Sequence, residues 1–149
     1  MPLSFRLLQV GDEAILTRIA PGVFDHAVRP EWAAEFLNDP RHHLVAALDG
    51  NTVVGFASAL HYLHPDKPPE LWINEVGVAE SHRGRGIAAG ILGRLLEHGR
   101  SLGCVQAWVL TAPDNAAANA LYRSAGGVAA GELSVMYEFD LNAGLSRQR

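Results

Sequence analysis

Hydrophobic positions recur along the chain with two different spacings, and these spacings predict the order of its elements. Short apolar runs bounded by turn residues predict strands at 4–10, 44–48, 53–60, 71–78, 105–110 and 135–141. Apolar residues three or four positions apart predict helices at 12–20, 30–37, 87–100 and 115–124. Strand 71–78 is apolar on both faces, which is typical of a central strand. This order predicts a mixed α/β (α+β) sheet with helices on both faces.

The predicted elements fit one domain. We expect residues 1–141 to form it and residues 142–149, which end in Ser-Arg-Gln-Arg, to form a flexible tail. Hydrophobic residues make up 48% and charged residues 19% of the 149, an ordinary balance for a globular protein. No apolar stretch approaches the length of a membrane span, and no secretory signal opens the chain. A single cysteine, Cys104, fits a reducing compartment, so we expect a cytoplasmic protein without membrane partners.

The formal net charge of −4 argues against nucleic-acid binding, which usually requires a basic face. It is compatible with a small cationic substrate. The charge therefore favours a small molecule over a nucleic acid as the partner.

The turn between strand 71–78 and helix 87–100 has the features of an anion site. It closes with Arg83, Gly84, Arg85 and Gly86, and the helix begins directly afterwards at Ile87. Glycines let successive backbone N–H groups point into one concavity, and a helix N-terminus adds unpaired N–H donors and positive dipole charge. Arginines add charge and forked donors that suit phosphate. A ligand with a diphosphate is therefore expected at this turn.

Two motifs resemble those of the GNAT superfamily of N-acetyltransferases. Residues 83–88 resemble its (Q/R)-x-x-G-x-(G/A) acyl-CoA signature. Residues 115–126 resemble its N-x-x-A-x-x-L-Y-x-x-x-G pattern, and the resemblance covers nearly the whole chain. It implies a GNAT-like mixed sheet of six to seven strands with a splay between the fourth and fifth.

The resemblance also implies acetyl-CoA as the co-substrate and no metal. Backbone N–H groups of 83–88 would cradle the pyrophosphate, and the main chain of strand 71–78 would pair with the pantetheine amides. Strand 105–110 would have to diverge from that strand, so that the gap admits the thioester. The implied cofactor-binding residues are Val76, Gly77, Val78, Arg83, Gly84, Arg85, Gly86, Ile87, Ala88, Asn115 and Tyr122.

In this family the amine attacks the thioester directly. An amine with a pKa near ~10 must lose a proton first. Glu75 is the candidate base because a lone carboxylate in an apolar strand is expected to be buried with a raised pKa. Glu70 is the alternative base, and Asn74 is a weaker choice. Tyr122 occupies the family's general-acid position, and a hydrogen bond to the leaving thiolate is the expected role.

Among GNAT enzymes, the chain most resembles the type I aminoglycoside 3-N-acetyltransferases, which carry an aspartate where Glu75 stands. The resemblance lies in 44–48, 53–55 and 69–75 and continues through 120–122 and 135–136. It implies a polycationic acceptor held by carboxylates. The expected acceptor-binding residues are Asp25, Glu70, Asn74, Glu75 and Tyr137.

Other functions stay open at this point. The acceptor could be another small amine or a peptide N-terminus, and a non-catalytic acyl-CoA-binding protein is a further alternative. A homodimer is common in the family. The pattern Gly84-x-Gly86-x-x-Ala89 also fits a dinucleotide site, but no acidic residue ends strand 105–110 as that site requires. His61, His64 and Asp66 lack a fourth ligand for a metal.

Overall fold

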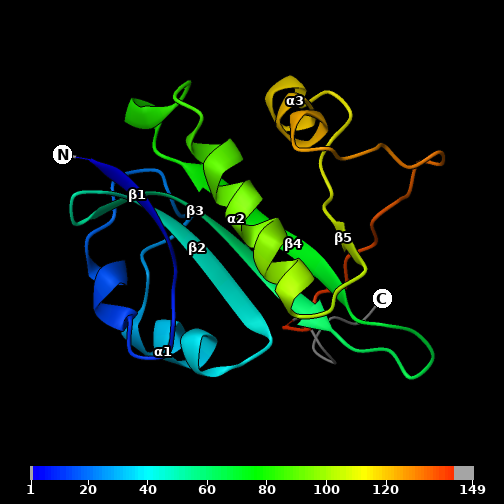
Figure 1. Cartoon of the computed structure of the whole chain (residues 1–149), viewed down its shortest axis with the longest axis horizontal. Coiled ribbons are helices and arrows are strands. Elements are labelled where there is room, and N and C mark those ends of the chain that lie inside the picture. The colour runs from blue at the N-terminus through cyan, green and yellow to red at the C-terminus, as the bar shows by residue number, and fades with distance from the viewer. Residues whose placement is uncertain (1, 143–149) are drawn as a thin grey trace.

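Five strands lie in sequence order in one mixed sheet (Figure 1). The computed structural model describes residues 2–142. Strands β1 (Leu3–Leu7), β2 (His42–Asp49), β3 (Thr52–Tyr62) and β4 (Glu70–Val78) pair antiparallel with their neighbours. Strand β5 (Gln106–Trp108) runs parallel to β4. The mixed sheet predicted from the order of elements is therefore present.

Helix α2 (Ile87–Ser101) covers one face of the sheet, where small residues allow it to lie close. A Cβ on Gly55 would lie 3.1 Å from side-chain atoms of Ile87 and Ile91, and one on Gly99 would lie 3.0 Å from Leu71. The other face is covered over β2 and β3 by η1 (Glu13–Thr17), α1 (Pro30–Asn38) and the loop between them. Helices thus lie on both faces, as predicted.

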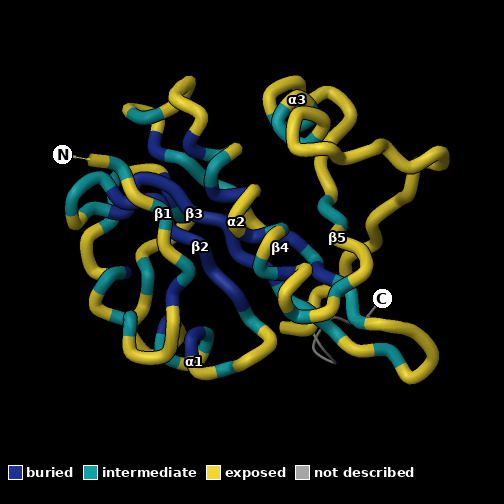
Figure 2. Tube along the Cα trace, viewed as in Figure 1, coloured by how far each residue is buried: buried dark blue, intermediate teal, exposed yellow. Residues whose placement is uncertain are grey.

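The hydrophobic core lies between α2 and the central strands. The largest fully buried side chains come from α2, β2, β3 and β4: Leu71, Ile87, Ile91, Leu92, Leu95, Val45, Val53 and Val54. Figure 2 shows this burial concentrated at β2, β3 and β4, whereas α3 (Ala116–Ser124) and the chain after it are mostly exposed. Strands β2, β3 and β4 together with α2 therefore form the buried centre of the molecule.

Strands β4 and β5 separate after a short paired region. In their register Glu70 pairs with Gln106 and Trp72 pairs with Trp108. Beyond Trp72, β4 continues to Val78 without pairing to β5. A three-residue pairing beside a nine-residue strand leaves the second half of β4 with a free edge. The predicted divergence of these strands is confirmed, and it begins at the two tryptophans.

A bulge in β4 decides which side chains share a face. Ser58 pairs with Glu75 and Ala59 pairs with Ile73, so Asn74 is the extra residue. Before the bulge, Leu71 faces α2. Without the extra residue, Glu75 would face α2 as well, because side chains alternate along a strand. The bulge instead places Glu75 on the face opposite α2, together with Glu70 and Trp72.

The strand predicted at 135–141 is wrong for this structure, and the sheet has five strands rather than six to seven. Val135, Tyr137 and Phe139 are 77%, 80% and 84% exposed. A period-2 pattern forms a strand only where a neighbouring edge accepts its backbone hydrogen bonds, and β5 extends for three residues only. Residues 143–149, most of the predicted tail, lie outside the described residues.

The N-terminal prediction of an α-helix over 12–20 is also wrong. The chain forms the short 3₁₀ helix η1, and Leu16 within it has non-helical dihedral angles. Asp12, the first residue of the predicted helix, makes no side-chain capping hydrogen bond. Its carboxylate instead accepts hydrogen bonds from the Gln9 backbone N–H at 2.8 Å and from Arg6 at 3.2 Å. A carboxylate held by preceding residues cannot satisfy the first turn of a following helix. Within residues 2–142, no helix is both long and apolar enough to cross a bilayer.

Candidate functional site

The turn before α2 adopts the conformation that its glycines predict. Gly84 and Gly86 both have φ of +76°, a left-handed conformation that side chains disfavour. A Cβ at either position would meet nothing within 4 Å, so backbone conformation rather than space requires glycine. The first helical hydrogen bond runs from the Gly90 N–H to the Gly86 carbonyl. The N–H groups of residues 87–89 therefore have no acceptor within the described chain, as an anion site requires.

Two side chains anchor this turn to the sheet. His82 Nε2 lies 2.9 Å from Asp49 Oδ2, and His82 Nδ1 lies 2.8 Å from the Ser81 hydroxyl. The hydrogen bond with His82 lowers the pKa of the Asp49 carboxyl below its usual range. Because Asp49 lies at the end of β2, the pair ties the turn to the β2–β3 hairpin. Sequence analysis did not identify this anchor, since 33 residues separate its members.

A cleft of about 710 Å³ opens between the end of β4, the start of α2 and α3. Ten of the eleven residues predicted to bind the cofactor line it: Val76, Gly77, Val78, Arg83, Gly84, Gly86, Ile87, Ala88, Asn115 and Tyr122. Arg85 is exposed and does not line the cleft. Asp25, predicted to bind the acceptor, lines it from the loop after η1. The fold thus gathers segments from both halves of the chain around one cavity.

The free edge of β4 presents backbone groups to this cleft. The Arg83 side chain donates from Nε to the Val78 carbonyl at 3.3 Å, so this carbonyl points away from β3. Residues two apart on a strand direct their N–H and C=O groups to the same side. Val76 therefore presents its backbone groups on the same edge, where an extended ligand with amide groups could pair with it.

Helix α3 supplies the far wall of the cleft. Asn115 caps it, because its Oδ1 accepts from the Ala118 N–H at 3.1 Å. One turn after Ala118, Tyr122 is partly buried, and burial raises its phenol pKa above the usual value. Its hydroxyl makes no hydrogen bond within residues 2–142. At neutral pH this cleft-lining residue therefore carries a protonated hydroxyl donor that has no competing partner within the described chain.

Besides Asp25, which lines the cleft, three predicted acceptor residues are exposed. Glu75 has no hydrogen bond or ion pair within the described chain, but it is exposed, so the expectation of a buried carboxylate is wrong. The bulge, which the sequence pattern does not reveal, turned Glu75 from the α2 face to the open face. Asn74 is exposed at the bulge itself. Tyr137 is 80% exposed and does not line the cleft, because its segment forms no strand.

Glu70 belongs to an aromatic cluster that sequence analysis missed. Tyr62 donates from its hydroxyl to Glu70 Oε1 at 3.0 Å, and Trp108 Nε1–H donates to the Tyr62 hydroxyl. The rings of Trp72 and Trp108 stack with centroids 5.7 Å apart and 19° between their planes. The only available signal was one tryptophan in each of two predicted strands. Their register, which places the rings opposite each other, was not available from the sequence.

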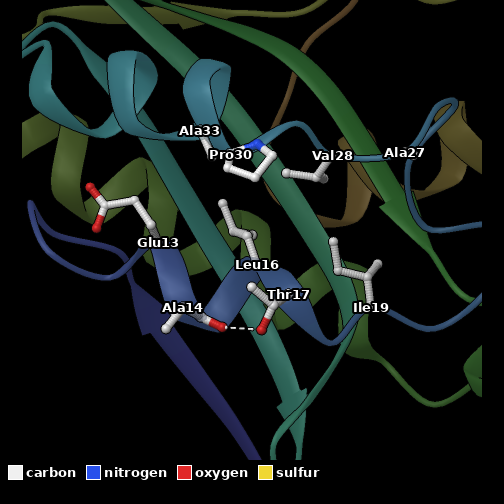
Figure 3. Close-up of a pocket in the computed structure, with 9 residues that line it drawn as sticks. All are labelled: Glu13, Ala14, Leu16, Thr17, Ile19, Ala27, Val28, Pro30 and Ala33. Carbon is white, nitrogen blue, oxygen red and sulfur yellow. Dashed lines mark hydrogen bonds between the residues drawn. The ribbon is translucent and has the colours of Figure 1, made fainter.

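A second cavity of about 480 Å³ lies between η1 and α1 (Figure 3). It is lined mainly by apolar side chains: Ala14, Leu16, Ile19, Ala27, Val28, Pro30 and Ala33, with Glu13 and Thr17. The Thr17 hydroxyl is bonded to the Ala14 carbonyl at 2.6 Å, and the Glu13 carboxylate points away from the other residues. This cavity offers no group for chemistry.

No group of three or more His, Cys, Asp or Glu side chains within residues 2–142 could hold a metal ion. His61 Nδ1 lies 2.7 Å from His43 Nε2, and His64 Nδ1 lies 3.1 Å from the Pro68 carbonyl. These contacts direct the two histidines to different partners.

Several known proteins are similar to this chain in sequence. The sequence model of the "Acetyltransferase (GNAT) family" matches residues 13–126. The N-alpha-acetyltransferase RimI of Mycobacterium tuberculosis is 41% identical over 90 residues, which cover 60% of this chain and 54% of RimI. An L-2,4-diaminobutyric acid acetyltransferase of Shouchella clausii is 37% identical over 81 residues, covering 53% of this chain and 43% of that enzyme. The chain thus spans about half the length of these relatives.

Solved structures share the fold. The aminoglycoside acetyltransferase meta-AAC0020, from an uncultured soil metagenomic sample, superposes with a TM-score of 0.79. The sequences are 18% identical, and the superposition covers 92% of this chain and 95% of that one. At this identity the likeness shows a common fold.

Proposed function

Because this chain belongs to the acetyltransferase (GNAT) family, we propose that it transfers an acetyl group from acetyl-CoA to a primary amine. The observation that carries the proposal is the cleft of about 710 Å³, which joins the turn before α2, the free edge of β4 and the Tyr122 ring. These parts match the three regions of an acyl-CoA: diphosphate, amide-containing arm and thioester.

The residues of the cleft fit acetyl-CoA. The unpaired N–H groups of residues 87–89 and the Arg83 side chain suit the diphosphate. Backbone groups of Val76 and Val78 suit the two amides of pantetheine. The thioester would then lie near Tyr122, at the point where β4 and β5 separate.

The acceptor amine approaches from the open face of the sheet, where Glu75 lies. Glu75, directly or through a water, takes the proton of the ammonium group and frees the nitrogen lone pair. The nitrogen forms a bond to the acetyl carbonyl carbon, and the carbon–sulfur bond breaks. Tyr122 donates a hydrogen bond to the departing thiolate, which then takes a proton, and the new amide loses its remaining extra proton to solvent.

We propose an aminoglycoside as the acceptor. The resemblance in residues 69–75 supports it, as do the carboxylates of Asp25, which lines the cleft, and of Glu70 and Glu75 on the open face of β4, which form no ion pair within residues 2–142. Polycations need such acids. The specific observation that favours a peptide N-terminus is the 41% identity to RimI, and the similarity to diaminobutyrate acetyltransferases favours a small diamino acid.

Release of CoA thiol would be measured with acetyl-CoA and three acceptors: a gentamicin-type aminoglycoside, a peptide with a free N-terminal alanine, and L-2,4-diaminobutyrate. We expect the highest kcat/KM with the aminoglycoside. Highest turnover with the peptide or the amino acid would replace that acceptor while leaving acetyl transfer in place.

A thermal melt with and without acetyl-CoA is the control. Stabilisation by acetyl-CoA without turnover on any amine would favour a non-catalytic acyl-CoA-binding protein. No stabilisation would contradict the cofactor site itself.

A further inference from the structure

The open face of β4 is unlike the face under α2. Leu71 and Ile73, which face α2, are 0% and 3% exposed. Glu70 and Trp72, on the other face, stay only partly buried, and Glu75 is exposed. Large aromatic side chains on a sheet are usually covered by another layer. Here η1 and α1 cover β2 and β3 and leave the β4–β5 end of this face accessible.

The aromatic cluster on this face is held rigid by its own polar contacts. Trp108 Nε1–H donates to the Tyr62 hydroxyl, which in turn donates to Glu70 Oε1 at 3.0 Å. Trp72 stacks on Trp108, and His64 packs edge-on to Tyr62 with centroids 5.1 Å apart. The indole N–H of Trp108 and the Tyr62 hydroxyl are therefore both satisfied. The second carboxylate oxygen of Glu70 remains without a partner within the described residues.

A positively charged group would complete this cluster. The faces of indole rings attract ammonium and guanidinium groups, and an adjacent carboxylate adds a direct charge partner. Elsewhere in the molecule a cation already lies over an indole ring, because the Arg29 guanidinium lies 4.3 Å from the centre of the Trp32 ring. Among residues 2–142, no such cation lies over Trp72 or Trp108, and none forms an ion pair with Glu70.

From these contacts we infer that Trp72, Trp108 and Glu70 form a second acceptor subsite, which binds a cationic group remote from the amine that is acetylated. The inference rests on the proposed acetyl transfer near Glu75. Trp72 and Glu75 pair with Leu60 and Ser58, which lie two residues apart on β3, so the bulge leaves Trp72 and Glu75 about 7 Å apart along the sheet. The subsite therefore selects acceptors whose second positive charge lies on the order of 7 Å from the reacting amine.

This spacing distinguishes between classes of amine. Aminoglycosides and long linear polyamines can place two charges this far apart, whereas the two amino groups of a short diamino acid lie closer together. Aminoglycosides and linear polyamines both carry a second positive charge at this spacing, so the test includes one compound of each class.

The first measurement compares KM values of the wild type for gentamicin, spermidine and a monoamine that lacks the second charge. KM should be at least ten-fold lower for one or both polycations than for the monoamine. In Trp72→Leu and Glu70→Gln this preference should shrink by ten-fold or more, and Trp72→Tyr should restore most of it. Trp32→Leu is the matched control, because that exposed tryptophan lies on α1, which packs on β2 rather than on the β4–β5 end of this face, and it should keep the preference intact.

The outcomes separate this subsite from the proposed function. Equal KM values for the polycations and the monoamine in the wild type, or an unchanged preference in Trp72→Leu and Glu70→Gln, would overturn the subsite while acetyl transfer stands. If no amine is acetylated, calorimetric titration of the CoA-loaded protein with gentamicin and spermidine tests the subsite by binding alone. Binding that weakens ten-fold in Glu70→Gln supports the subsite, and absence of binding refutes it. A variant counts only if its thermal midpoint and its stabilisation by acetyl-CoA match those of the wild type.

Discussion

The two sides of the gap between β4 and β5 are built on different principles. On the proposed cofactor side, the groups available to a ligand belong mainly to the backbone: the amides of residues 87–89, the left-handed Gly84 and Gly86, and the free edge of β4. On the proposed acceptor side, the available groups are side chains that come from β3, β4 and β5: Tyr62, Glu70, Trp72, Glu75 and Trp108. A backbone site can be recognised from a contiguous motif, whereas a side-chain site depends on strand register.

Substitutions on the two sides of the gap should therefore change different measured quantities. Changes on the acceptor side should alter kcat or the acceptor KM and leave acetyl-CoA affinity intact. Changes in the backbone of the turn should alter acetyl-CoA affinity and stability together. Substitutions in each region therefore test whether the two sides act independently.

The largest effect is expected for Glu75→Gln, which keeps the size of the side chain but removes its ability to accept a proton. Loss of a general base costs about 10²–10⁴-fold in rate, so kcat should fall by roughly 10³-fold at pH 7. Steady-state kinetics at saturating acetyl-CoA would measure it, with Glu70→Gln as the matched variant. A larger fall of kcat in Glu70→Gln than in Glu75→Gln would assign the base to Glu70 instead.

Tyr122→Phe removes the hydroxyl that is proposed to face the thioester and keeps the ring that packs on the core. We expect kcat to fall by about 10²-fold, because a hydrogen bond that strengthens in the transition state is lost. The dissociation constant of acetyl-CoA, measured by calorimetry, should change much less. Because burial raises the phenol pKa, kcat of the wild type should not decline through ionisation of this tyrosine up to about pH 9. An unchanged kcat in Tyr122→Phe would remove this residue from the mechanism.

A buried histidine away from the gap should make stability depend on pH. Burial and the neighbouring His98, His61 and His42 lower the pKa of His43 from 6.5 to about 4, a shift that the more distant Asp39 partly opposes. Below pH 6.5 the unfolded chain therefore binds this proton more strongly than the folded one, so stability falls as pH falls toward 4. From the 6.5 and about 4 values, the loss between pH 7 and pH 5 is about 2 kcal/mol.

Urea unfolding at pH 7 and pH 5 would measure this loss, and His43→Gln should show a smaller difference between the two pH values. An equal difference in the variant would show that other groups carry the pH dependence. The same experiment shows how much of any loss of activity at low pH comes from unfolding rather than from a change in catalysis.

Gly86→Ala tests the backbone side. A side chain in the left-handed conformation costs about 1–2 kcal/mol, which we expect as a lower free energy of unfolding. Relief of that strain would move the turn, so the dissociation constant of acetyl-CoA should rise several-fold. Denaturant unfolding and calorimetry would measure the two effects. Unchanged affinity for acetyl-CoA would argue that the turn does not bind the diphosphate.

The smallest effect is expected for Gly93→Ala, the matched control for that substitution. Gly93 lies inside α2, has no left-handed φ, and an added Cβ would meet nothing within 4 Å. Alanine is favoured over glycine in a helix interior, so the free energy of unfolding should rise by about 0.5–1 kcal/mol. Acetyl-CoA affinity should stay unchanged. A loss of affinity in this variant would mean that α2 as a whole, rather than its first turn, controls binding.

Several parts of the fold followed from sequence because they depend on local chemistry. The helix that begins at Pro30, the glycine turn before α2 and the helix near residues 115–124 were all predicted and are present, and Asn115 caps the last of them. The strand at 135–141 and the helix at 12–20 were not found. Their local patterns were suitable, but a strand needs a partner edge and a helix needs its capping group free.

The sequence by itself determined the cofactor side of this protein, because glycine conformation and a helix N-terminus are properties of neighbouring residues. Only the tertiary structure decided the acceptor side. The bulge at Asn74 moved Glu75 to the open face, and the pairing of β4 with β5 brought Trp72 against Trp108. The physical reason is the two-residue period of a strand: one inserted residue reverses every side chain that follows, and the apolar pattern alone does not reveal where that residue lies.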